Sequence, residues 1–63
     1  MSKWVVVVGM RTSKDFDYDI YEVEYSGIYH HNRDDARQEF LEAKYETEPD
    51  PYVDSVYIQE VFS

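Results

Sequence analysis

Cysteine is absent from this chain, and glycine and proline are scarce, with two residues of each. Without cysteine there is no disulfide and no thiolate metal site, which fits a cytoplasmic protein. Two glycines are too few for a glycine-rich phosphate-binding loop. No apolar run approaches the roughly 18 residues of a transmembrane helix, and none has the make-up of a signal peptide. We therefore expect a single small domain over residues 1–63, cytoplasmic and without a membrane partner.

Basic residues are also few. Six Lys and Arg stand against 14 Asp and Glu, giving a net charge of −8, and residues 15–63 contain all of the acids. A field this negative repels phosphate backbones, so we expect no direct nucleic-acid binding. It attracts basic protein surfaces, although solubility alone also explains the charge.

Hydrophobic residues, in contrast, make up 43% of the chain, and aromatic residues 17%, which is too much for a disordered tail. The most prominent run is Val5 to Val8, whose stiff χ1 angles favour a strand over residues 3–11. The run does not alternate with polar residues, so both faces of this strand should be covered. So short a chain has few elements with which to cover them.

Two further strands are expected on either side of a helical segment. Residues 17–25 alternate between two faces and predict the second strand, with Ser26 and Gly27 marking its end or a bulge. Residues 55–62 alternate in the same way and predict the last strand.

The helix has clear start and stop signals. Asn32 is a favourable N-cap, and Asp35 lies at the spacing of a capping box. An apolar stripe follows at helical spacing. Its residues are Ala36, Phe40, Leu41 and Ala43. Pro49 disfavours helical backbone at Glu48, so we expect the helix to end near Thr47.

The element order β-β-α-β predicts an α+β fold. A short connection favours antiparallel pairing of the first two strands, and a helical crossover favours a parallel return of the third. We expect a three-stranded mixed sheet in the order 2-1-3, with the first strand in the centre and the helix packed on one face.

The other face of this sheet would lack a helix. The pattern leaves open whether Trp4, Val6 and Val8 or Val5 and Val7 of the first strand lie there. A contiguous aromatic and aliphatic face is uncommon on a monomer and is typical of an interface. The candidate interface residues are Trp4, Tyr18, Ile20, Tyr57 and Val61, with Glu22 and Glu24 at their rim.

Two simpler explanations of this face stay open. The N-terminus, the proline loop or Phe62 folds over it, or the exposed tyrosines are merely tolerated.

The helix carries a second candidate surface, on its charged side. An array of carboxylates can imitate the phosphates of DNA and occupy a nucleic-acid-binding protein. The candidate acidic residues are Asp34, Asp35, Glu39, Glu42 and Glu46. An ordinary solvated helix face explains the same pattern.

Chemical motifs are weak. His30 and His31 are adjacent and so point in different directions, and the i, i+4 histidine pair of a helical zinc site is missing. The serines have no base at a motif spacing, and so few elements leave little room for a pocket. We expect no enzyme: no catalytic residues, no metal site and no cofactor.

One resemblance covers most of the chain. Residues 32–43 contain the Arg-x-x-Ala of Arg33 to Ala36, and residues 54–61 contain the Val-Tyr-Ile-x-Glu of Val56 to Glu60. With the Val-rich first strand, this pattern resembles small proteins encoded by phages and prophages of Gram-positive bacteria. The resemblance implies a small α+β fold and a role in phage–host conflict or regulation. It carries no known site residues.

The sequence therefore predicts a non-enzymatic protein-interaction module that uses its open sheet face, foremost by self-association into a homodimer. The alternative is an acidic inhibitor or DNA mimic of phage origin that acts on a nucleic-acid-binding host protein.

Overall fold

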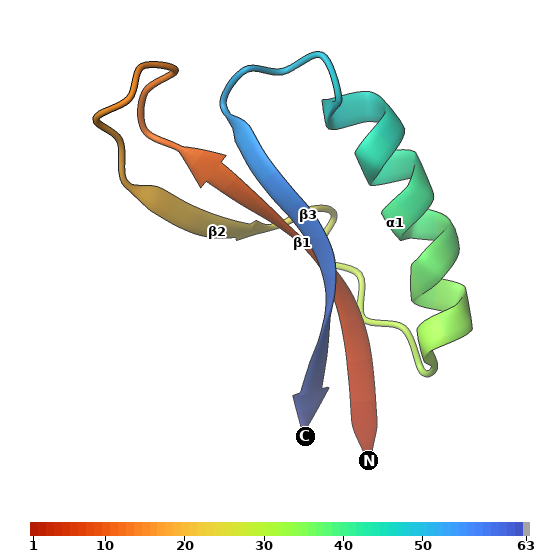
Figure 1. Ribbon diagram of the computed structural model, residues 1–63. Helices are drawn as coiled ribbons and strands as arrows, with labels where there is room; N and C mark the ends of the chain where they lie inside the picture. Colours follow the sequence, from red (N-terminus) through yellow and green to blue (C-terminus); the bar gives the residue numbers. More distant parts are fainter. Residues whose placement is uncertain (63) are drawn as a thin grey trace.

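The computed structural model describes residues 1–62 and contains the four expected elements. They are β1 (Ser2–Arg11), β2 (Ile20–Glu24), α1 (Arg33–Thr47) and β3 (Val53–Phe62). The strands form one sheet in the order β2-β1-β3, and α1 lies along one side of it (Figure 1). The α+β class, the β-β-α-β order and the central place of the Val-rich strand are confirmed.

The expected mixed sheet needs one correction. β1 pairs antiparallel with both β2 and β3, so no two neighbouring strands are parallel. The crossover rule itself holds, because β2 and β3 run in the same direction on either side of β1. The helical connection therefore crosses over the central strand. The two strands that it joins, β2 and β3, are not hydrogen-bonded to each other.

The register assigns each side chain to a face, because residues directly opposite in an antiparallel pair share one. Val6 lies opposite Ile58, and Val8 lies opposite both Val23 and Val56. These residues form the helix face, together with Trp4, Met10 and Tyr21. The open face holds the alternate set: Lys3, Val5, Val7, Gly9, Arg11, Ile20, Glu22, Glu24, Ser55, Tyr57, Gln59 and Val61.

Small side chains let the helix approach the sheet closely. Val6, Ala36 and Ala43 are fully buried, and Phe40 is half-buried beside them. Leu41, expected to widen the apolar stripe, is 56% exposed, because it lies to the side of the line that joins the two alanines. The contact of α1 is therefore a narrow stripe on β1 and β3.

The helix start follows the prediction. Asn32 is the N-cap, and its Oδ1 accepts a hydrogen bond of 2.9 Å from the backbone N of Asp35. Its Nδ2 donates to Asp35 Oδ2 at 3.0 Å, which completes a capping-box-like pair. The helix ends at Thr47, shortly before Pro49, as expected. None of the helical segments in residues 1–62 has the length and hydropathy that spanning a bilayer requires.

The connection between β2 and α1 turns at Gly27, whose φ of 71° is a left-handed conformation that glycine adopts without strain. The chain then returns to the sheet. Trp4 N donates to His30 O at 2.9 Å, and His30 N donates to Trp4 O at 2.7 Å. This bridge places His30 on the helix face and extends the cover of β1 toward its N-terminal half.

Candidate interaction surface

The structure places four of the five predicted interface residues at or beside the open face. Tyr57 and Val61 lie there on β3, and Ile20 lies there on β2, with β1 between them. Tyr18 precedes β2 and stacks with the guanidinium of Arg11, whose Cζ lies 5.1 Å from the ring centroid. Trp4 is on the helix face, opposite Glu60, so it is not part of the same surface.

Two tyrosine–glutamate pairs close the middle of the open face. The Tyr57 hydroxyl on β3 hydrogen-bonds Glu22 on β2, and the Tyr29 hydroxyl donates to Glu24 Oε1 at 2.5 Å. Each carboxylate raises the pKa of its tyrosine, chiefly through this hydrogen bond. Beneath these pairs Val5 is 1% exposed and Val7 is 6% exposed. The chain thus covers both faces of its central strand by itself.

The side chains that cover the open face differ from those that the sequence suggested. Phe62 is 78% exposed and does not fold over the face. The expected acidic rim, Glu22 and Glu24, instead holds the tyrosines in place. The register of three strands was needed to see the pair of Tyr57 and Glu22, because these residues are distant along the chain, whereas Tyr29 and Glu24 are only five residues apart.

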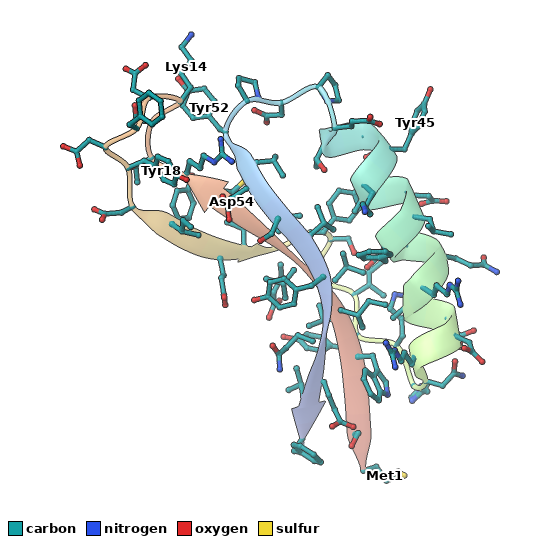
Figure 2. The ribbon with its side chains drawn as sticks, viewed as in Figure 1. Met1, Lys14, Tyr18, Tyr45, Tyr52 and Asp54 are labelled. Carbon is teal, nitrogen blue, oxygen red and sulfur yellow. The ribbon has the colours of Figure 1, made fainter. Side chains whose placement is uncertain are left out.

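One end of the sheet is tied by a charged cluster. The Arg11 guanidinium contacts Asp54 Oδ1 at 3.2 Å, and Arg11 N donates to Tyr52 O at 2.6 Å. Figure 2 shows Tyr18, Tyr52 and Asp54 at this same end, near the connection that carries Lys14. The cluster holds the β1–β2 connection against the start of β3.

The predicted acidic surface is divided by the fold. Asp34 and Glu42 are exposed, and Asp35 takes part in the helix cap. Glu46 accepts a hydrogen bond from the Tyr25 hydroxyl, which raises the pKa of Tyr25 to about 12, with desolvation and the charges of nearby carboxylates adding to the effect. The Glu39 side chain is 12% exposed and accepts from Ser26 Oγ at 2.7 Å. Three of the five carboxylates, Asp35, Glu39 and Glu46, therefore make contacts within the fold.

His30 faces Glu39 across a short gap. Its Nε2 lies 3.4 Å from Glu39 Oε1, and both atoms are buried without a hydrogen bond of good geometry. His31 is exposed. Residues 1–62 bring together no set of three His, Asp or Glu side chains suited to a metal ion.

The sheet is most exposed along β2, a side that the sequence pattern did not single out. α1 packs against β1 and β3, and β2 lies beyond it, on the side of the sheet remote from the helix (Figure 1). All five β2 residues are exposed, with Ile20 at 54%, Tyr21 at 49% and Val23 at 45%. The exposure of one outer strand could have been expected from the number of elements. One helix about 10 Å wide covers only about two strands spaced about 4.8 Å apart.

On the helix face this flank forms a groove of about 250 Å³. Its lining is mainly apolar and includes Val8, Met10, Tyr21, Val23, Tyr25 and Val53. The end of α1 closes one side of the groove at Thr47. We call β2 together with this groove the β2 flank.

Two larger grooves follow the other side of the helix, along β3. Their volumes are about 810 Å³ and 660 Å³. The fold therefore leaves more room for a pocket than the sequence led us to expect. The first is lined by Leu41, Lys44 and Val56, among others, and the second by Arg37 and Phe40. They exist because the narrow contact stripe of α1 leaves the outer side of β3 uncovered.

Comparison with protein-family profiles, curated proteins and solved structures gave no match. The resemblance to small phage proteins therefore stays a prediction.

Proposed function

We propose that this protein is a non-enzymatic protein-interaction module and that its contact surface is the β2 flank. One observation carries the proposal: five consecutive residues of an edge strand are exposed on both faces of the sheet. Among them Ile20, Tyr21 and Val23 each leave about half of their surface in water. Apolar and aromatic side chains gathered in this way are typical of interfaces.

The β2 flank has the composition of such a surface. Tyr21 is a rigid aromatic residue of the kind that anchors interfaces, and it lies beside an apolar groove. Glu22 and Glu24 on the other face supply charge that steers a partner.

The sequence favoured self-association into a homodimer as the form of this interaction, and the homodimer stays a prediction. Its argument was that a partner must cover the second face of β1. The burial of Val5 and Val7 within the single chain removes that argument. Light scattering across a dilution series tests the homodimer directly.

The acidic inhibitor or DNA mimic is the alternative proposal, and less of the structure supports it. The Glu39 side chain is only 12% exposed and turned toward the loop, so the array loses this member, while Glu46 accepts a hydrogen bond from Tyr25. Asp34 and Glu42 remain exposed on the helix. A phage origin is part of this alternative.

Photo-crosslinking tests the proposed function without knowledge of the partner. Tyr21 is replaced by a benzoyl-phenylalanine, and in a matched control Tyr45 is replaced instead. Tyr45 is 80% exposed and points away from the sheet (Figure 2). We expect a saturable adduct with one protein, identified by mass spectrometry, at position 21 and not at position 45.

Competition sharpens this test. Excess unlabelled protein should remove the adduct, whereas excess Val23→Asp protein should not, because the new charge lies in the groove. Circular dichroism verifies that the Val23→Asp variant is folded. The absence of an adduct, or the same adducts at both positions, contradicts the proposal.

A further inference from the structure

We infer that the β2 flank binds an extended segment of a partner as a fourth strand, and that this segment alternates Lys or Arg with apolar residues. The inference rests on the proposed function and names its partner chemistry.

The first support is the direction of the β2 backbone. Thr12 N donates to Asp19 O at 3.0 Å, and Tyr25 N donates to Val6 O at 2.9 Å, so the odd-numbered residues turn their backbone groups toward β1. Because these groups alternate along a strand, Ile20, Glu22 and Glu24 turn theirs outward. β2 is the end of the sheet, so this row of donors and acceptors is a site for strand addition.

The second support is the difference between the two faces that an added strand would extend. On the open face its neighbours are Ile20, Glu22 and Glu24. On the helix face its neighbours are Tyr21, Val23 and the groove behind them. An added strand that alternates basic and apolar side chains satisfies both faces at once.

The third support is charge. Residues 15–29 contain five acids and no Lys or Arg. The groups that hydrogen-bond Glu22 and Glu24 are tyrosine hydroxyls and not Lys or Arg, so neither carboxylate is paired with a cation of this chain. A basic segment is therefore attracted to this edge and held there.

The same charges argue against a second copy as the occupant. Two β2 strands paired antiparallel about Glu22 would place Glu22 against Glu22 and Ile20 against Glu24. Like charges directly opposite each other in a sheet are destabilising. A homodimer through β2 is thus disfavoured, whereas a basic strand is favoured at the same place.

The test uses an alternating Lys-Val peptide long enough to pair with all of β2, and the intact protein. The control peptide has the same composition with its lysines and valines in two blocks. We expect the alternating peptide to bind at least about tenfold more tightly, since only it matches both faces. Equal affinity for the two peptides, or no binding of either, overturns the inference.

Backbone pairing is tested by N-methylation of the peptide on either all lysines or all valines. One set has its N–H groups directed at β2 and the other has them directed away. We expect one methylated peptide to lose binding and the other to keep it. Antiparallel addition assigns the loss to the lysine set. Loss with neither set, or equal weakening by both, is incompatible with a fourth strand.

Charge is tested on the protein side. Glu22→Gln with Glu24→Gln should weaken the alternating peptide about tenfold, while the amide oxygens still accept the tyrosine hydroxyls. Glu42→Gln on the helix with Glu48→Gln at its C-cap makes the same change in net charge and should have little effect. Equal weakening by both pairs would mean general attraction to an acidic protein and would refute the inference.

The peptide experiment and the crosslinking experiment test different claims, so one can give a negative result without the other. An adduct at position 21 without peptide binding leaves the proposed function standing and removes the fourth strand. Absence of any adduct removes the proposed function itself.

Discussion

The Tyr57 hydroxyl on β3 reaches across the central strand to the Glu22 carboxylate on β2. Tyr57 lies opposite Val7, whereas Glu22 lies opposite Gly9, so the contact runs diagonally over the open face. It joins the two outer strands, which share no backbone hydrogen bonds. The pair therefore both shields β1 from water and links the edges of the sheet.

Removal of this link should be measurable in the free energy of unfolding. Tyr57→Phe keeps the ring over Val7 and loses the hydrogen bond, so we expect a loss of about 1 kcal/mol. Tyr57→Ala also uncovers Val7 and should lose roughly 2 kcal/mol or more. Urea unfolding measures both. Tyr45→Phe on the exposed side of the helix is the control and should be nearly neutral. A neutral Tyr57→Ala would show that this ring does not cover the strand.

The two faces of β1 should contribute equally to stability, although only one has a helix. Val5 is 1% exposed on the open face, and Val6 is 0% exposed on the helix face. We expect Val5→Ala and Val6→Ala each to lower the free energy of unfolding by about 2 kcal/mol, from lost burial and the cavity left behind. Neither loss should depend on protein concentration. A Val5→Ala effect that appears only at high concentration would mean that a second copy covers the open face.

Alkaline pH should loosen the contact between Tyr25 and α1. The hydrogen bond to Glu46 raises the pKa of Tyr25 from 10.0 to about 12. A raised pKa means that the folded protein holds this proton more tightly than the unfolded chain does. The contribution to stability is complete below pH 10 and is lost as the pH rises through about 12.

Two measurements check this effect. The ultraviolet absorbance of tyrosinate should show late-titrating groups, and Tyr25→Phe should remove one of them. The free energy of unfolding of the wild-type protein should fall between about pH 10 and about pH 12 by more than that of Tyr25→Phe. Equal falls would show that the Tyr25–Glu46 contact does not contribute to folding. The raised pKa values of Tyr29 and Tyr57 act in the same direction and persist in both proteins.

Local signals in the sequence predicted the elements well. The β-branched run at Val5 to Val8 became the central strand, and Asn32 and Pro49 bracketed the helix. These signals succeed because they depend on χ1 stiffness, a side-chain cap and a fixed φ, all of which act within a few residues. The direction of β3 relative to β1 was predicted incorrectly, because the expected mixed sheet made them parallel and the structure pairs them antiparallel.

The candidate site was harder to predict, for a physical reason. Alternation along the strand placed Tyr21 and Val23 on the same face. It did not predict which strands of that face the single helix would cover. The width of α1 and its alanine stripe fix it over β1 and β3, which leaves β2 exposed. Trp4 went to the helix face because register, not composition, selects which alternate set faces the helix.

What the sequence determined by itself was the four elements, the central place of β1 and the acidic character of residues 15–29. Each follows from short-range stereochemistry or from composition. Only the tertiary structure decided that tyrosines close the open face, that Glu39 and Glu46 serve the fold, and that β2 is the exposed edge. These outcomes depend on the distances between segments far apart in the chain, which are set when the helix and strands pack together.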